Sequence, residues 1–208
     1  MTAPSGAVFF AHHAQARPVP PSLQAAPAGS ALSGSACSTM QAMSPTKTTA
    51  QPAHAAPEFE EEFIAGLKII FEEKIVFNQL LGLKVTSLRP ERVTARIDMR
   101  PALIGHHAYG RLHGGVISAG LDAVGALAVM AAIGARHMDE TPAQRLHRYN
   151  RLGTIDLRVD YLRPGISEHF ELRGEVLRLG SRVASTRMEF LGADGTLFST
   201  GSAAYIVS

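Results

Sequence analysis

The chain has 208 residues and a formal net charge of +2 at pH 7. Two of its 20 basic residues, Arg17 and Lys47, precede residue 58, whereas all 18 acidic residues follow residue 57, so residues 58–208 are formally neutral. A neutral domain gives no electrostatic reason to bind nucleic acid. The single cysteine, Cys37, excludes a disulfide framework within the chain and a thiolate metal site. We therefore expect the protein in a reducing compartment.

Residues 1–57 have a composition unlike the rest, with no acidic residue and an abundance of alanine, serine, proline and threonine. Such a segment buries too little apolar surface to fold, so we predict a disordered tail, followed by one domain over residues 58–208. The tail has two interpretations. Either Met40 or Met43 is the true start and the upstream sequence is a gene-model extension, or the tail is an organellar targeting segment, for which two basic residues are few. The first interpretation predicts a cytoplasmic protein and the second an organellar one.

Past residue 57 the spacing of apolar residues becomes regular. Residues 58–82 place phenylalanine, leucine and isoleucine at helical intervals, carry acidic residues in the first turns and end at Gly82, so they predict one amphipathic helix. Residues 83–99 alternate apolar and polar side chains on the two sides of Pro90. This pattern predicts two strands joined by a turn.

Residues 114–134 form a long apolar run that contains one carboxylate, Asp122. A helix without a polar face is buried, either in a protein core or in a membrane. Asp122 would cost about 2.5–3.5 kcal/mol at the centre of a membrane, and the five glycines of the run weaken a lone helix, so we predict a core helix and no membrane span. Residues 136–152 are polar and predict a short surface helix or a lid.

Four strand-like segments with alternating side chains follow in a row, over residues 154–162, 169–179, 182–192 and 196–207. A Pro-Gly turn at residues 164 and 165 and an Ala-Asp-Gly hairpin at residues 193–195 keep the connections short. Short connections predict that these strands are antiparallel neighbours in chain order. The architecture that fits this order of elements is α+β, with a curved antiparallel sheet wrapped around the central helix.

Three motifs carry a resemblance to a known family: LHGGVI at residues 112–117, LD at residues 121 and 122, and RLGTIDLRVDYLRPG at residues 151–165. Together they resemble the hotdog-fold acyl-CoA thioesterases of the PaaI-like group, over about residues 60–208. The resemblance implies the hotdog fold and cofactor-free hydrolysis of medium- to long-chain fatty acyl-CoA to the free acid and CoA. Hotdog proteins also include 3-hydroxyacyl-thioester dehydratases and non-enzymatic acyl-CoA sensors, which remain the alternatives.

The predicted central helix offers the chemistry that thioester hydrolysis needs. Gly114 and Gly115 lie where backbone N–H groups lack an intrahelical acceptor, at the positive end of the helix dipole, and no side chain obstructs an approaching carbonyl. We expect the Gly114 N–H to stabilise the oxyanion, with Gly115 beside it in substrate binding. Asp122, the only acid of the apolar run, is expected to act as general base or nucleophile.

Distance along the helix decides how these groups can cooperate. Eight residues separate Gly114 from Asp122, which amounts to about 12 Å of helical rise. One chain cannot bring both groups to the same carbonyl, so we predict a homodimer with each site shared between two subunits. The resemblance implies the same sharing. Whether dimers pair further into tetramers stays open.

The resemblance also implies roles for residues near these two. His113 is expected to orient the bound thioester, although it could simply cap the helix. Thr154 is expected to place the attacking water, although ordinary strand alternation would also explain a threonine there. Members of the group tend to have Asn or Gln six or seven residues before His113, where this chain has His106 and His107. A neutral imidazole can donate the same hydrogen bond, and we assign this role to His107, with His106 as the alternate.

Other sites are weaker or excluded. Arg163, and Arg111 with it, could contact the phosphates of CoA. The nine histidines form no H-E-x-x-H motif and have no cysteine partner nearby, so no metal site is expected. Ser118 lacks the G-x-S-x-G context of a serine hydrolase, and the Gly105–Gly110 spacing lacks the Lys-Ser/Thr of a phosphate-binding loop.

Overall fold

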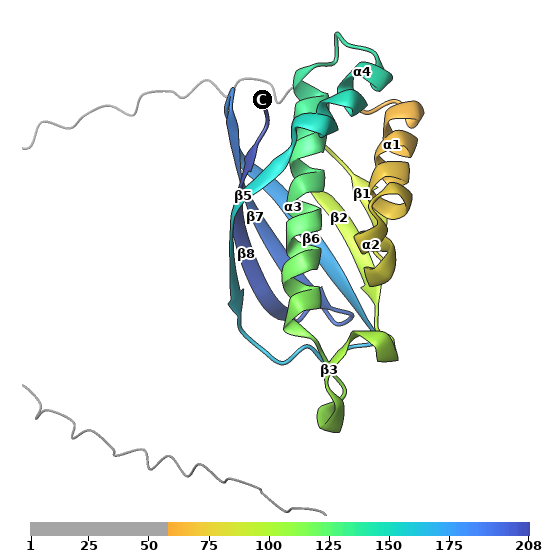
Figure 1. The fold of residues 1–208 in the computed structure, drawn as a ribbon, viewed down its shortest axis with the longest axis vertical. Helices are drawn as coiled ribbons and strands as arrows, with labels where there is room; N and C mark the ends of the chain where they lie inside the picture. Colours follow the sequence, from red (N-terminus) through yellow and green to blue (C-terminus); the bar gives the residue numbers. More distant parts are fainter. Residues whose placement is uncertain (1–57) are drawn as a thin grey trace, which may run out of the picture. The chain divides into compact units, whose positions relative to one another are not determined.

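A six-stranded antiparallel sheet curves around one long helix, α3 (Gly114–Arg136) (Figure 1). The computed structural model describes residues 58–208, so the predicted tail and Cys37 lie outside the described residues. The strand order is β1-β2-β6-β7-β8-β5. The strands are β1 (Lys84–Leu88), β2 (Val93–Asp98), β5 (Gly153–Tyr161), β6 (His169–Leu179), β7 (Val183–Gly192) and β8 (Leu197–Ile206). This arrangement confirms the predicted α+β architecture.

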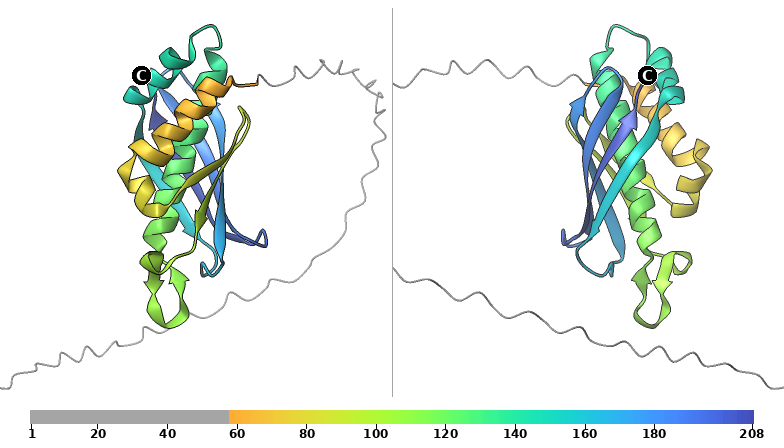
Figure 2. Two further views of the ribbon diagram at one scale, coloured as in Figure 1. Left: turned by 90° about the vertical axis from the view of Figure 1, so that its right-hand side faces the viewer. Right: turned by 60° about the vertical axis from the view of Figure 1, so that its left-hand side comes forward.

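Helix α3 lies on the concave side of the sheet, as Figure 2 shows from two further directions. Its side chains Leu121, Val124 and Leu127 are fully buried, and burying each of them stabilises the fold by about 1.5–3 kcal/mol. Helix and sheet approach closely, because a Cβ atom on Gly174 of β6 would lie 2.6 Å from the Val124 carbonyl oxygen. Of the described helices, α3 alone is long and apolar enough to cross a membrane, yet 72% of its most apolar window is buried within the protein. The apolar run is therefore the predicted core helix.

The predicted single helix over residues 58–82 is wrong in one respect, because the helix is interrupted. It consists of α1 (Glu61–Lys68), a π-helical turn (Ile69–Lys74) and α2 (Val76–Leu81). Ile75 is extended at the break, with ψ of 94°. The buried Asn78 side chain donates a hydrogen bond to the Phe71 carbonyl, 3.0 Å away, which satisfies a group that the break would otherwise leave open. Gly82 ends the segment as predicted, with a left-handed φ of 69°.

The predicted neighbour of β5 is also wrong. Strands β6, β7 and β8 are antiparallel neighbours in chain order, as expected, but β5 pairs with β8 and forms the edge of the sheet. The connection from β5 to β6 is not a tight turn: it passes below the start of α3, where the Leu112 N–H donates to the Gly165 carbonyl at 2.9 Å (Figure 1). The Pro-Gly pair at residues 164 and 165 serves this crossing, which local turn signals could not distinguish from a hairpin.

The polar segment over residues 136–152 contains the predicted short helix, α4 (Pro142–His147), followed by a 3-10 turn (Arg148–Arg151). Its surface character is only partial, because Arg145 is fully buried. The Arg145 guanidinium lies over the Phe63 ring, 4.5 Å from the centroid, and pairs with Glu60. Arg145 therefore packs α4 onto α1.

Residues 104–112 project from one end of the domain as a small hairpin of β3 (Ile104–His106) and β4 (Arg111–Leu112) (Figure 2). Gly110 supplies its left-handed position, with φ of 58°. Strands of three and two residues are too short to show an alternating pattern, and the sequence analysis predicted no element there. The hairpin leads directly into His113 and the start of α3.

Candidate active site

Asp122 is held by two hydroxyl groups. It lies half-buried on α3, where its Oδ1 accepts a hydrogen bond from Thr154 Oγ1 at 2.9 Å and lies 3.2 Å from the Tyr205 hydroxyl. The Tyr205 hydroxyl also donates to the Asp122 backbone carbonyl at 2.9 Å. Among the described residues, none donates a hydrogen bond to the other carboxylate oxygen, Oδ2. The carboxylate is therefore oriented through one oxygen, while the other stays open to a reactant.

Strand pairing brings the two hydroxyl groups together. Thr154 on β5 lies opposite Tyr205 on β8 in the register of the edge pair. Gly125 makes room for the tyrosine, because a Cβ atom there would lie 2.3 Å from the Tyr205 hydroxyl. Burial, and then the neighbouring Asp122 carboxylate, raise the pKa of Tyr205 well above its usual range. The hydroxyl therefore stays protonated and acts as a donor.

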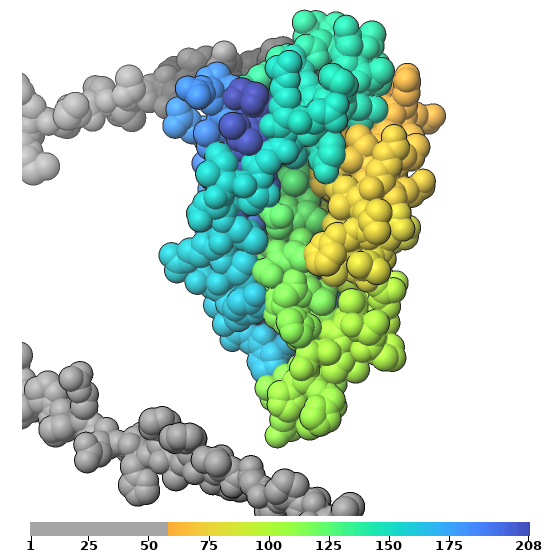
Figure 3. Space-filling model, viewed as in Figure 1, coloured from red at the N-terminus to blue at the C-terminus, as the bar shows by residue number. Residues whose placement is uncertain are grey.

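A pocket of about 210 Å³ opens in front of Asp122. Its apolar walls come from the interrupted N-terminal helix, from α3 and from the segment before β5. In the space-filling view (Figure 3), α3, in green, reaches the surface between β5, in cyan, and the N-terminal helices, in yellow. Small residues on this stripe of α3, Ala119, Ala123 and Ala126, line the pocket together with Asp122. The carboxylate therefore lies in a largely apolar recess that remains reachable from outside.

At the start of α3 the two glycines have different environments. The Gly115 N–H donates to His113 Nδ1 at 2.8 Å, so His113 caps the helix, the alternative that the sequence left open. Within residues 58–208, no hydrogen bond uses the Gly114 N–H, whereas the Gly114 carbonyl accepts one from the Tyr161 hydroxyl at 3.0 Å. An N–H at the first helical position without an acceptor is suited to binding an anionic oxygen.

The structure does not bring Gly114 and Asp122 together within one chain. Both lie on the uninterrupted helix α3, so a helical rise of about 12 Å separates them. The pocket in front of Asp122 is lined by Thr154 and Tyr205, and Gly114 does not belong to it.

His106 and His107 lie on the exposed hairpin, with ring centroids 6.0 Å apart, and neither lines the Asp122 pocket. The hairpin packs closely against His113, because a Cβ atom on Gly105 would lie 2.6 Å from the His113 Cα. Both histidines therefore lie near the start of α3, outside the Asp122 pocket.

The two arginines have local partners. The Arg163 side chain donates to the Leu197 carbonyl at 2.8 Å. The Arg111 guanidinium lies over the Tyr109 ring, 4.6 Å from the centroid. Each arginine side chain is thus fixed by a contact with a residue of this chain. In the part of the chain that the structure describes, no group of three or more His, Cys, Asp or Glu side chains could hold a metal ion.

The sequence analysis missed Tyr205, Tyr149 and Asn78, all of which line the Asp122 pocket. Tyr205 lies in an alternating strand, where a buried tyrosine is ordinary. Its relation to Asp122 depends on β8 pairing with β5, which the sequence analysis did not predict. No local pattern identifies these three residues.

Comparison with known proteins adds an independent finding. The family model described as "Thioesterase superfamily" matches residues 109–199. The medium/long-chain acyl-CoA thioesterase YigI of Escherichia coli (strain K12) is 34% identical over 145 residues, which make up 68% of this chain and 94% of that protein. A crystal structure of a Shewanella oneidensis protein related to the thioesterase superfamily is similar with a TM-score of 0.67 and 39% identity, covering 71% of this chain and 96% of that one.

Proposed function

This chain belongs to the thioesterase superfamily and is a thioester hydrolase, and on that premise we propose that it hydrolyses medium- to long-chain fatty acyl-CoA to the free acid and CoA. The observation that carries the proposal is Asp122, oriented by Thr154 and Tyr205 with one oxygen free, in an apolar recess. YigI, which is 34% identical over 68% of this chain, is a medium/long-chain acyl-CoA thioesterase. We place the reaction in the cytoplasm, because the one cysteine of the chain gives no sign of an oxidising compartment.

The proposed chemistry uses two positions on α3, Gly114 and Asp122. The Gly114 N–H, unused within the described residues, stabilises the negative charge that develops on the thioester oxygen. As a general base, Asp122 takes a proton from water while the water oxygen attacks the carbonyl carbon. The C–S bond then breaks and the thiolate of CoA leaves, taking up a proton. As a nucleophile, Asp122 would instead form an acyl-enzyme anhydride that water hydrolyses.

The site needs two subunits, because one α3 keeps Gly114 and Asp122 apart. Among the described strands, β5 has no neighbour on the side away from β8, and its Ile155 and Tyr161 side chains are 57% and 55% exposed. Pairing of two β5 edges about a two-fold axis would set the open stripes of two α3 helices side by side in opposite directions. Asp122 of one subunit would then face Gly114 of the partner subunit.

We assign roles in this arrangement to the remaining predicted residues. The Thr154 hydroxyl donates its proton to Asp122, and its oxygen can still accept a hydrogen bond from the attacking water. His113, through its cap on Gly115, fixes the helix start that presents Gly114. His107, with His106 as the alternate, would approach the thioester from the hairpin, and Arg163, with Arg111, is the candidate for a CoA phosphate.

The test is CoA release by Asp122→Asn, which keeps the shape of the side chain and removes its charge. We expect turnover of dodecanoyl-CoA to fall by about 10² or more, the size of losing a general base. Asp139→Asn is the matched control, because Asp139 is exposed and outside the pocket. Unchanged turnover in Asp122→Asn would contradict the proposed chemistry, and binding of acyl-CoA by the wild type without CoA release would mark a binding protein instead.

A further inference from the structure

A second cavity adjoins the Asp122 pocket. It measures about 590 Å³ and lies between the α1 and π-helical segment on one side and the α4 and 3-10 segment on the other. Most of its lining is apolar and includes Ile69, Ile70, Ala143 and Leu146. We call it the α1–α4 groove.

Two side chains, Ile75 and Tyr149, line both the Asp122 pocket and the α1–α4 groove. They stand between the two spaces. The pocket, at about 210 Å³, is smaller than the about 300–1,000 Å³ usual for a small-molecule site, whereas the groove falls within that range. A long substrate whose reacting carbonyl lies at Asp122 therefore needs space beyond the pocket, and the groove is the adjoining space.

The groove arises where the N-terminal helix is interrupted. Mid-helix π turns are often found at functional sites, and here the π turn (Ile69–Lys74) and the extended Ile75 form one wall of the groove. At Gly66 the two helices make close contact, because a Cβ atom there would lie 2.2 Å from Leu146 Cδ1. Helices α1 and α4 are thus in contact at Gly66, while the groove beside it stays open.

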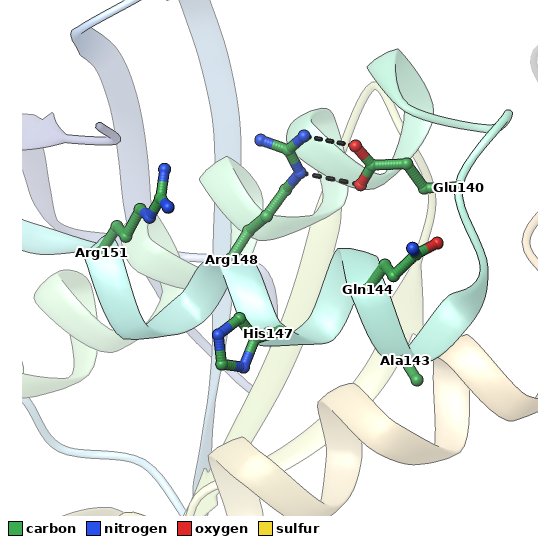
Figure 4. A pocket seen from close by; sticks show the side chains of 6 residues that line it. All are labelled: Glu140, Ala143, Gln144, His147, Arg148 and Arg151. Atoms are coloured by element: carbon green, nitrogen blue, oxygen red, sulfur yellow. Dashed lines mark hydrogen bonds and ion pairs between the residues drawn. The ribbon is translucent and has the colours of Figure 1, made fainter.

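The side chains around α4 indicate an apolar occupant. In Figure 4, Ala143 and His147 lie on the side of the segment that faces α1, drawn in tan, whereas Arg148 turns away to bind Glu140. Lys74, His147 and Asn150, which also line the groove, are all exposed. A mostly apolar lining whose polar side chains reach solvent suits a hydrocarbon chain rather than an anion.

We propose that the α1–α4 groove binds the distal methylenes of the fatty acyl chain, which pass between Ile75 and Tyr149. This inference rests on the proposed function. These two side chains, together with Ala143 on the far wall, then set the chain length that the enzyme accepts. The reacting thioester remains at Asp122, so the groove contributes specificity and not chemistry.

The test compares kcat/KM for dodecanoyl-CoA with that for butanoyl-CoA, using the full chain. Ala143→Trp fills the groove from its far wall, and we expect the dodecanoyl to butanoyl ratio to fall about tenfold or more, the size of losing contacts with one or two methylenes. Ile75→Ala widens the passage and should move the preferred substrate from dodecanoyl-CoA toward hexadecanoyl-CoA. Ala65→Trp is the matched control, because Ala65 is exposed on α1 and lines neither cavity.

The outcomes separate the two proposals. A wild type that releases CoA from no fatty acyl-CoA of any length overturns the proposed function, and the groove assignment with it. An active wild type whose ratio Ala143→Trp leaves unchanged overturns the groove assignment alone. Thermal unfolding shows whether each variant is folded, and if Ala143→Trp does not fold, the substrate preference of Ile75→Ala decides. An equal shift in Ala65→Trp would also count against the groove.

Discussion

Two positions on α3, its start at Gly114 and Asp122 two turns further on, are built in different ways. At Gly114 the group proposed to react is a backbone N–H, and its direction follows from the helix start. At Asp122 the group proposed to react is a side chain, and its direction depends on hydroxyl groups from β5 and β8. Each position leaves one polar atom without a partner among the described residues, the Gly114 nitrogen and Asp122 Oδ2. In the proposed mechanism, secondary structure thus directs the oxyanion donor, whereas tertiary structure directs the base.

The largest effect that isolates the Gly114 end is expected from Gly114→Pro. Proline removes the N–H, and it suits the first helical position, where its φ is already helical. His113 before it has φ of −67° and ψ of 133°, a conformation compatible with a following proline. We expect kcat to fall by about 10²–10³, as for loss of an oxyanion donor, with little change in thermal unfolding.

Gly114→Ala is the comparison variant, because it keeps the N–H and its Cβ would lie 3.4 Å from the Tyr161 ring, an ordinary contact. Any loss of kcat in Gly114→Ala measures obstruction of the approaching carbonyl, and the further loss in Gly114→Pro measures removal of the N–H. Mixing Gly114→Pro with Asp122→Asn tests the sharing of the site. Each mixed dimer then holds one intact site, so re-equilibrated mixtures should recover about a quarter of the wild-type activity. Mixtures that stay inactive would show that one chain supplies both groups.

The contrast between Gly114 and Asp122 also explains which parts of the candidate site could be predicted from the sequence. The His-Gly-Gly start of α3 and the lone Asp122 could be recognised because both signals are local in sequence. The orienting role of Tyr205 and the edge position of β5 could not, because strand order is a property of the whole sheet. The alternation in residues 154–161 indicates a strand but says nothing of its neighbour.

A smaller effect is expected from Tyr205→Phe, which removes one of the two donors to Asp122. Thr154 still binds Oδ1 at 2.9 Å, so the carboxylate keeps part of its orientation. We expect kcat to fall about tenfold, near the 1.5 kcal/mol that one hydrogen bond to a charged group contributes, while KM changes little. Steady-state kinetics with dodecanoyl-CoA measures the split between kcat and KM.

Tyr161→Phe is the matched change at the start of α3, since Tyr161 donates to the Gly114 carbonyl at 3.0 Å. That carbonyl takes no part in the reaction, so we expect a change in kcat of less than about threefold. Equal losses in the two tyrosine variants would mean that neither hydroxyl acts through the base.

The smallest effect concerns the contact that joins α4 to the start of α1, the pair of Glu60 with buried Arg145. The hydrogen bond from Arg145 lowers the pKa of Glu60 below its ordinary value of 4.5. A carboxyl whose pKa is lower in the folded state stabilises the fold above its unfolded pKa, and this contribution disappears as the pH falls through the folded pKa. The melting temperature of the wild type should therefore fall more steeply than that of Glu60→Gln between pH 5 and about pH 3.

Glu61→Gln, at an exposed position without an ion pair among the described residues, should follow the wild type. Parallel curves for wild type and Glu60→Gln would mean that Arg145 holds α4 through its stacking on Phe63 and not through the carboxylate.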